Sequence, residues 1–511
     1  MIRTKAGLLV LAALAVWALA DLLADAAVNA PADLVGFARR TWPLDFPAAA
    51  EILTQTGRTL AVVLLATILA VLIGVPLAVA AATRGRLAAR ALLTVARATP
   101  DVVLAVVFVR FFGLGALPAV LGMGLHSAGM VGKLYAEAIE HADVRPRHAV
   151  RAVGASPVQE FVTGVLPQVV PAFIAIGLHR FDINLRISAI LGFVGAAGIG
   201  TEMALAFGRL DYPRGMAWAV ILFVVLLLVE VVSAVLRGAL LRAPGRSVMD
   251  RPIGRRRATM PPLTLRRIVG YLAVVVTAAL VGWSVTSSGV LDATLVDDAS
   301  ETLALFWPPD SAGVDLLAAL LVTLQVALAG TLLGAVFAVP LGSLAARNVA
   351  PNRWMYGSGR ALVLVVRGLP ELVLGIVFVV LTGLGPVAGV LALALGATGL
   401  LGKLVADSLE NLPPGPAVAL RAVGASRLQT YVGATLPQAA PILLGQVLYQ
   451  LDAGIRAATL LGLVGAGGIG LYLLQAMRTR EYPVVTLVLL MILGVLLGVE
   501  TLTSWLNRKV R

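Results

Sequence analysis

The stretch RAVGAS decides the architecture of this chain, because it occurs twice, at Arg151–Ser156 and at Arg421–Ser426. Both copies are polar, are interrupted by a glycine and lie in long apolar surroundings. The same tripeptide follows each copy at the same distance, as Leu166–Gln168 and as Leu436–Gln438. Such a repeated pattern predicts an internal duplication.

A constant offset of 270 residues (421 − 151) aligns other motifs as well. It maps LGFVGAAGIG at Leu191–Gly200 onto LGLVGAGGIG at Leu461–Gly470. Nearer the N-terminus, the apolar stretch from Thr59 resembles the stretch from Thr323, with an offset of 264 (323 − 59). We therefore predict a tandem duplication: a first copy at 1–240 with a core at 57–240, a basic linker at 241–267, and a second copy at 268–511 with a core at 316–508.

The composition indicates a membrane protein. The chain is 59% hydrophobic and only 13% charged, with a mean hydropathy of +0.95, so it lacks the charge for a soluble shell. Windows such as Leu60–Ala82 and Leu317–Ala338 have almost no charge and reach the ~20 residues that cross a bilayer. The absence of cysteine excludes disulfides and thiolate metal sites. We expect no metal site, because the four histidines form no HExxH-like pair. We expect no nucleic-acid binding either, since the net charge of +13 suits the cytoplasmic loops of a membrane protein.

The predicted fold class is an all-α polytopic membrane protein with about 12 transmembrane helices, six in each copy. An even number of spans gives both copies the same orientation, so the repeats are parallel and related by a pseudo-twofold axis. The first apolar run is expected to be an uncleaved helix rather than a signal peptide. The predicted spans are 7–28, 57–83, 88–113, 117–140, 161–181 and 214–237 in the first copy, and 268–287, 316–345, 360–383, 386–410, 431–452 and 483–506 in the second.

Loop charges predict the orientation. The connector Arg237–Arg267 holds nine arginines and one aspartate, whereas Thr286–Asp315 holds six acidic residues and no Lys or Arg. The positive-inside rule places the connector and both termini in the cytoplasm and the acidic loop outside. We thus expect a multi-pass protein of the cytoplasmic (inner) membrane, with lipid headgroups as further partners of the arginines.

Both RAVGAS copies fall on the predicted cytoplasmic side, between the fourth and fifth spans. Each follows a proline, Pro146 or Pro416, and reads as a short helix, a Gly-Ala-Ser corner and a second short helix. A tight interhelical turn is one interpretation. A second interpretation is a twofold docking surface, and the presence of two equivalent copies favours it.

The spacing from Gly154 to Leu166-Pro167, and from Gly424 to Leu436-Pro437, resembles the EAA loop of binding-protein-dependent ABC importer permeases. In that family the loop is a coupling helix that sits in a groove of the ATP-binding subunit. The second copy, with GASRLQ, LPQ and LYQLDAGIRAATLLGLVGAGGIG, resembles more closely the permeases of phosphonate importers, the PhnE family. The resemblance covers about 57–240 and 316–508 and implies the transmembrane fold of a type I importer.

The chain departs from the family pattern in two ways. The usual glutamate, six residues before the glycine, is His148 in one copy and Val418 in the other, so Arg151 and Arg421 are candidates to supply docking energy instead. Such permeases are usually separate chains, whereas here one chain is expected to make the whole pore. The ATPase-coupling residues that the resemblance implies are His148, Arg151, Gly154, Ala155, Ser156, Leu166, Pro167, Val418, Arg421, Gly424, Ala425, Ser426, Leu436 and Pro437.

The resemblance implies a pore subunit that imports phosphonate, phosphite or phosphate by alternating access. The implied partners are two copies of an ABC ATPase subunit similar to PhnC and an extracytoplasmic solute-binding protein similar to PhnD. The chain is not expected to be an enzyme or to hold a cofactor: Gly132-Lys133 and Gly402-Lys403 lack the remaining residues of a P-loop, so ATP and Mg would be bound by the partner ATPase. Two alternatives stay open: an ABC permease for another small solute such as methionine, and a secondary transporter.

Polar and glycine-rich segments mark a candidate substrate path. Asp and Arg four residues apart share a helix face, which predicts either an intrahelical ion pair or a pathway. The glycine runs either expose backbone N–H groups to an anion or allow close helix packing. Arginines inside spans either contact the anion or extend to the interface. The candidate path residues are Arg97, Arg110, Asp182, Asn184, Arg186, Gly195, Gly198, Arg367, Asp452, Arg456, Gly465, Gly467 and Gly468.

Overall fold

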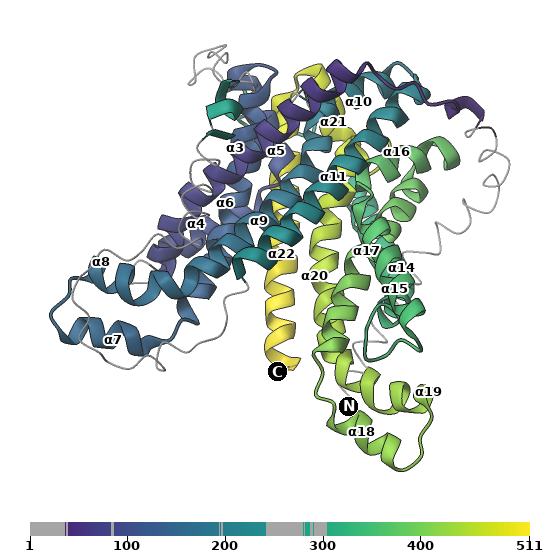
Figure 1. Cartoon of the computed structure of the whole chain (residues 1–511). Coiled ribbons are helices and arrows are strands. Elements are labelled where there is room, and N and C mark those ends of the chain that lie inside the picture. Colours follow the sequence, from purple (N-terminus) through teal and green to yellow (C-terminus); the bar gives the residue numbers. More distant parts are fainter. Residues whose placement is uncertain are drawn as a thin grey trace. The chain divides into compact units, whose positions relative to one another are not determined.

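The computed structural model describes residues 39–82, 86–193, 198–241 and 304–510, together with positions 36, 195, 279–280, 282–286 and 290. Helices dominate these ranges (Figure 1). The predicted span at 7–28 lies outside the described residues, and so does most of the span at 268–287.

The helices of the two copies correspond one to one in chain order. In the first copy they are α3 (Ala49–Ala82), α4 (Arg86–Ala98), α5 (Asp101–Phe112), α6 (Ala116–Glu140), α7 (Val144–Ala152), α8 (Pro157–Glu160), η1 (Phe161–Val165), α9 (Leu166–Gly192), α10 (Ile199–Gly208) and α11 (Tyr212–Leu241). In the second they are α14 (Leu316–Leu344), α15 (Arg353–Gly368), α16 (Glu371–Thr382), α17 (Pro386–Glu410), α18 (Gly415–Ala422), α19 (Arg427–Thr430), η4 (Tyr431–Thr435), α20 (Leu436–Gly462), α21 (Ile469–Thr479) and α22 (Tyr482–Val510).

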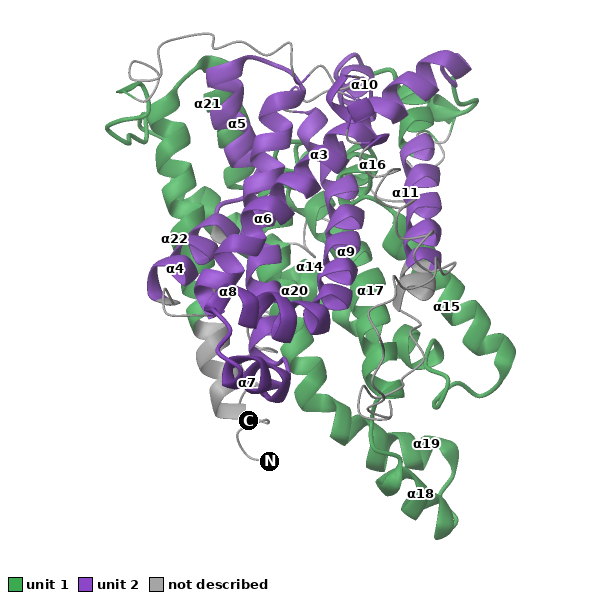
Figure 2. Cartoon of the chain, turned by 60° about the vertical axis from the view of Figure 1, so that its left-hand side comes forward, with its two compact units in different colours: residues 1–45, 210–219, 298–511 green, residues 46–209, 220–297 purple. Residues whose placement is uncertain are grey.

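The chain forms two compact units (Figure 2). One unit contains residues 46–209 and 220–297, and the other contains residues 1–45, 210–219 and 298–511. Each unit therefore holds most of one copy, but 1–45 and 210–219 group with the second copy, and 268–297 group with the first. The domain boundaries at 240 and 268 stay a prediction.

Six described helical segments are long and apolar enough to cross a membrane, or eight if each of two bent helix pairs is counted as one span. The polytopic character is thereby confirmed, whereas the count of about twelve remains a prediction. The six segments are Ala49–Ala82, Pro157–Gly192, Tyr212–Ser233, Leu316–Leu344, Pro386–Glu410 and Tyr482–Val499.

Each of the predicted spans at 88–113 and 360–383 is divided into two helices. The chain bends by 86° between α4 and α5, and by 81° between α15 and α16. Pro100 and Pro370 have extended backbone and directly precede α5 and α16. Proline donates no backbone hydrogen bond and disfavours helix at the residue before it, so α4 and α15 end before these prolines. The arginines of α4 and α15 give each helix one polar face, as expected of a helix that lies along an interface.

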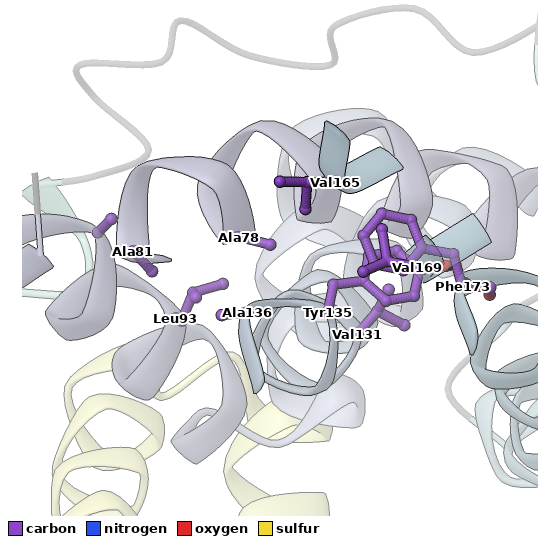
Figure 3. Packing of buried hydrophobic residues seen from close by; sticks show 10 residues of the cluster. Ala78, Ala81, Leu93, Val131, Tyr135, Ala136, Val165, Val169 and Phe173 are labelled. Carbon is purple, nitrogen blue, oxygen red and sulfur yellow. Dashed lines mark hydrogen bonds between the residues drawn. The ribbon is translucent and has the colours of Figure 1, made fainter. Parts of the chain in front are cut away.

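The core of the first copy packs α3, α4, α6 and α9 around an aromatic pair (Figure 3). The Tyr135 ring stacks on the Phe173 ring with centroids 3.9 Å apart, and the Tyr135 hydroxyl donates to the Phe173 carbonyl over 3.0 Å. The equivalent residues of the second copy are Val405 and Leu443, which belong to an aliphatic cluster. The same helix frame thus accepts two different core packings.

Glycines let α6 approach α4 and α5 closely. A Cβ atom at Gly122 would lie 2.6 Å from the backbone N of Ala105, and one at Gly129 would lie 2.5 Å from the backbone N of Arg97. The second copy repeats the second contact, because a Cβ at Gly399 would lie 2.6 Å from the backbone N of Arg367. Small residues at such crossings are typical of membrane helix packing.

Candidate functional site

Each RAVGAS copy folds into the predicted helix–glycine–helix corner. We call residues 144–165 the first elbow and residues 415–435 the second elbow. Gly154 has φ = 85° and Gly424 has φ = 86°, a conformation that costs other residues energy. The amide of each glycine donates over 3.0 Å to the carbonyl of the arginine three residues earlier, Arg151 or Arg421.

The serine that ends each RAVGAS copy starts the next helix. Ser156 and Ser426 are N-caps of α8 and α19, and each forms a capping box with a glutamine three residues later. These caps were not predicted from the sequence, although the Ser-x-x-Gln spacing carries the signal. The repeated motif therefore encodes both sides of a corner: a helix end with glycine and a helix start with serine.

A five-residue π-helix joins each elbow to its long helix, η1 before α9 and η4 before α20. Pro167 and Pro437 occupy the first turn of those long helices. Because proline has no N–H to donate, the wider turn accommodates the Leu-Pro pair. Single π-turns inside α-helices are frequent at functional sites.

The elbow tips expose apolar side chains at equivalent positions. Val153 is 83% exposed and Val423 is 80% exposed, and Val158 and Leu428 are 72% and 71% exposed. The side chains of His148, Val418, Arg151 and Arg421 are also exposed. Exposed apolar groups beside cations suit an interaction surface, as the docking interpretation expects.

Different contacts stabilise the two elbows. In the first, Arg147 forms an ion pair with the buried Glu160. The equivalent residues in the second elbow are Ala417 and Thr430, so that pair is not possible there. Instead, Arg427 Nη1 donates to the Pro351 carbonyl over 2.6 Å, linking α19 to the loop before α15.

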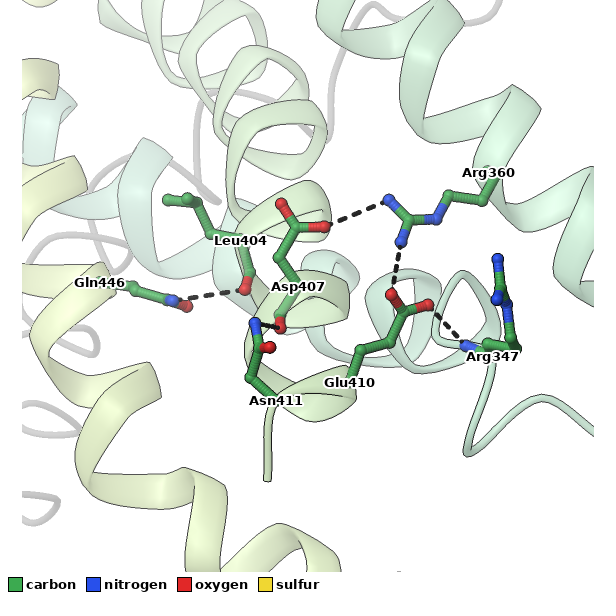
Figure 4. Close-up of polar contacts among 7 residues, drawn as sticks. All are labelled: Arg347, Arg360, Leu404, Asp407, Glu410, Asn411 and Gln446. Atoms are coloured by element: carbon green, nitrogen blue, oxygen red, sulfur yellow. Dashed lines mark hydrogen bonds and ion pairs between the residues drawn. The ribbon is translucent and has the colours of Figure 1, made fainter. Parts of the chain in front are cut away.

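An ion pair lies just before each elbow. Arg90 Nη2 lies 2.5 Å from Glu140 Oε1, and at the equivalent positions Arg360 Nη2 lies 3.1 Å from Glu410 Oε2. Arg360 Nη1 also lies 3.2 Å from Asp407 Oδ1 (Figure 4). These pairs link the bent helices α4 and α15 to the ends of α6 and α17. These ion pairs were not predicted from the sequence, although the offset of 270 aligns both partners.

The Asp–Arg segments lie inside α9 and α20, not beyond a span. The predicted ends of these spans at 181 and 452 were wrong, since the helices continue to Gly192 and Gly462. In the second copy the predicted intrahelical ion pair between Asp452 and Arg456 is present.

In the first copy the equivalent charges, Asp182 and Arg186, bond to α11. Ser233 Oγ donates to Asp182 Oδ1 over 2.8 Å. Arg186 Nη2 lies 3.3 Å from Glu230 Oε2. The two copies therefore stabilise equivalent charges differently.

The glycine runs end α9 and α20 and allow the next helix to fold back. A Cβ at Gly192 would lie 2.0 Å from the backbone carbon of Gly200, so close packing accounts for this position. The first amide of α10, at Ile199, donates to Thr59 Oγ1 over 2.9 Å, and the amide of Ile469 donates to Thr323 Oγ1 over 2.8 Å. The candidate path glycines all have positive φ: Gly195, Gly198, Gly465, Gly467 and Gly468.

The remaining candidate path arginines lie on three different helices. Arg97 is half-buried in the last turn of α4, Arg110 is half-buried in α5, and Arg367 is 8% exposed in the last turn of α15.

Asn184 belongs to a buried hydrogen-bond chain that crosses three helices. Arg180 Nε donates to Ser127 Oγ over 2.7 Å, and Ser127 Oγ donates to Asn184 Oδ1 over 2.9 Å. Asn184 Nδ2 then donates to Thr67 Oγ1 over 3.0 Å, and Thr67 Oγ1 to the Val63 carbonyl over 2.8 Å. The chain thereby connects α9, α6 and α3. Of these four side chains, only Asn184 was a predicted path residue.

Comparisons with known proteins agree with this architecture. The family model described as "Binding-protein-dependent transport system inner membrane component" matches twice, at residues 70–243 and 338–511. The phosphate-import permease protein PhnE of Mycolicibacterium smegmatis is 39% identical over 505 residues, which are 97% of this chain and 92% of that protein. These matches confirm the predicted fold class, a polytopic helical membrane protein with two permease copies.

Two shorter relatives match about one copy each. The phosphite transport system permease protein PtxC of Stutzerimonas stutzeri is 36% identical over 47% of this chain and 89% of its own length. The probable D-methionine transport system permease protein MetI of Haemophilus influenzae is 28% identical over 37% of this chain and 93% of its own length. The chain therefore belongs to the family of binding-protein-dependent transport system inner membrane components, and it carries two copies of the family unit in one polypeptide.

Proposed function

We propose that this chain forms the transmembrane path of an ATP-driven importer for oxyanions of phosphorus, the class that includes phosphate, phosphite and phosphonate. The observation that carries the proposal is the 39% identity to a phosphate-import permease over 97% of the chain. A phosphite permease that resembles one copy supports the same substrate class. A solute-binding protein would deliver the anion on the outer face.

ATP hydrolysis would come from separate ATPase subunits, two copies similar to PhnC, that bind ATP and Mg. The elbows are the proposed docking segments, and their exposed valines and arginines would enter a groove on each ATPase. Movement of the ATPases would then pass through the π-turns into α9 and α20. The solute-binding partner would be similar to PhnD, and the elbows and both termini would face the cytoplasm.

Reconstitution tests the substrate class. The chain would be placed in liposomes with the ATPase and binding protein encoded beside it, and ATP hydrolysis and uptake would be measured with phosphate, phosphite, methylphosphonate or methionine. We expect stimulation by a phosphorus oxyanion alone. Stimulation by methionine alone would keep the importer and overturn its substrate, and a failure to bind any ATPase would overturn the importer itself.

A further inference from the structure

We infer that Arg180 is an anion-contacting residue of the transport path, that the first copy alone supplies it, and that Ser127 and Asn184 are positioning residues that hold it. The inference rests on the proposed function, because it assumes an anionic substrate. Its support comes from the buried hydrogen-bond chain and from a comparison between the two copies.

Arg180 occupies an unusual place for a cation. It lies near the middle of α9, about 20 Å from either end at ~1.5 Å per residue, and only 4% of its surface is exposed. A charge at such a depth in a membrane helix is costly and usually marks a path for ions or substrate.

The second copy serves as an internal control for a purely structural role. The residues equivalent to Arg180, Ser127 and Asn184 are Gln450, Ala397 and Gly454. Helices α17 and α20 nevertheless form with bounds that match α6 and α9 at the offset of 270, and α14 takes the place of α3 in the chain order. The fold therefore does not require a cation, an acceptor hydroxyl or an amide at these positions.

The hydrogen-bond chain fixes the orientation of the guanidinium. Each donor points the same way, from Arg180 through Ser127 and Asn184 to Thr67. Ser127 and Asn184 are fully buried, so solvent does not compete for these bonds. Chains of this kind polarise and rigidify their members, and a held guanidinium matches the geometry of phosphate-type oxygens.

The substitution Arg180→Gln tests the inference, because glutamine is the residue of the second copy and keeps an N–H for Ser127. We expect uptake to fall about tenfold or more, as for one lost charge-assisted hydrogen bond. Stimulation of ATP hydrolysis by the loaded binding protein should stay within about twofold, since the elbows are unchanged. Arg180→Lys should restore part of the uptake because it restores the charge.

Asn184→Gly tests the positioning role. It copies Gly454 and keeps the cation but removes its support, so we expect a smaller loss of uptake than in Arg180→Gln. The matched control is Gln450→Met in the second copy. The buried amide oxygen of Gln450 has no hydrogen-bond partner among the described residues, so uptake by this variant should stay within about twofold of that by the original chain.

Three results would overturn the inference. The first is unchanged uptake in Arg180→Gln. The second is an equal loss of uptake, stimulated hydrolysis and thermal stability that Arg180→Lys does not repair, which would make the residue purely structural. The third is an equal loss of uptake in Gln450→Met. Failure of the proposed function can be distinguished from these results, because the original chain itself would then not take up a phosphorus oxyanion.

Discussion

Gly154 and Gly424 are single residues on which the geometry of the elbows depends. Each has positive φ, and a Cβ there would meet nothing within 4 Å. A substitution would therefore be penalised through the backbone and not through a clash. Because a substitution would change the backbone of the elbow without a steric clash, these two positions can test whether the elbows couple ATP hydrolysis to transport.

We predict that Gly154→Val with Gly424→Val strains each corner by about 1–2 kcal/mol and lowers uptake more than ATP hydrolysis. The ratio of uptake to hydrolysis in proteoliposomes measures this effect. Gly154→Asn with Gly424→Asn is the control, because asparagine tolerates the left-handed region. A normal ratio in the valine variant would show that the corner does not transmit coupling.

Gly192 differs from Gly154 and Gly424, because a side chain there is excluded by lack of space and not by the backbone φ angle. Gly192→Ala would force a Cβ to 2.0 Å from the Gly200 backbone. We expect a loss of about 1–3 kcal/mol, as for overpacking, seen as a lower melting temperature in detergent. Gly208→Ala is the matched control, since a Cβ there meets nothing within 4 Å; equal melting temperatures of the two variants would contradict the prediction.

Single residues also show the limit of what the sequence can predict. The spacing of Asp452 and Arg456 predicts their ion pair because both partners lie on one helix. The pair between Arg186 and Glu230 joins two helices, so only the packed structure identifies it. The same holds for the contacts of Asn184 with Ser127 and Thr67.

At the scale of elements, the offset of 270 predicts the order and type of nearly every described helix, whereas bends and ends are harder. Apolar content continues across Pro100, so hydropathy merges α4 and α5 into one span although proline separates them. Charges at Asp182 and Arg186 suggest that a span has ended. The helix continues because partners on α11 compensate those charges.

The short helices of the elbows depend on their caps. We predict that Ser426→Ala costs about 1 kcal/mol and raises the rate of amide hydrogen exchange in α19. Ser426→Asp should keep the slower exchange, because aspartate also accepts from the N3 amide. Ser156→Ala should raise exchange in α8 to a similar extent, because each elbow has one further contact, the Arg147–Glu160 pair in the first and the Arg427–Pro351 hydrogen bond in the second; unchanged exchange in both alanine variants would show that the caps do not hold the short helices.

At the scale of the whole chain, duplication explains the common backbone of the copies, and divergence explains their different contacts. Equivalent sites hold Tyr135 or Val405 in the core and Arg180 or Gln450 in the polar interior. Two identical subunits could not differ in this way. A fused chain can therefore give one copy a task that the other lacks, as we infer for Arg180.

The orientation in the membrane is a property of the whole chain that can be measured directly, because the sequence has no cysteine. Every introduced thiol will thus be the only one. We predict that a membrane-impermeant maleimide added to intact cells labels Leu305→Cys, in the predicted outer loop Thr286–Asp315, and does not label Ala149→Cys in the first elbow. Both positions are exposed in the structure, so permeabilised cells should label both and supply the control. Labelling of Ala149→Cys alone in intact cells would reverse the orientation, and it would remove the elbows from the side where ATP is available.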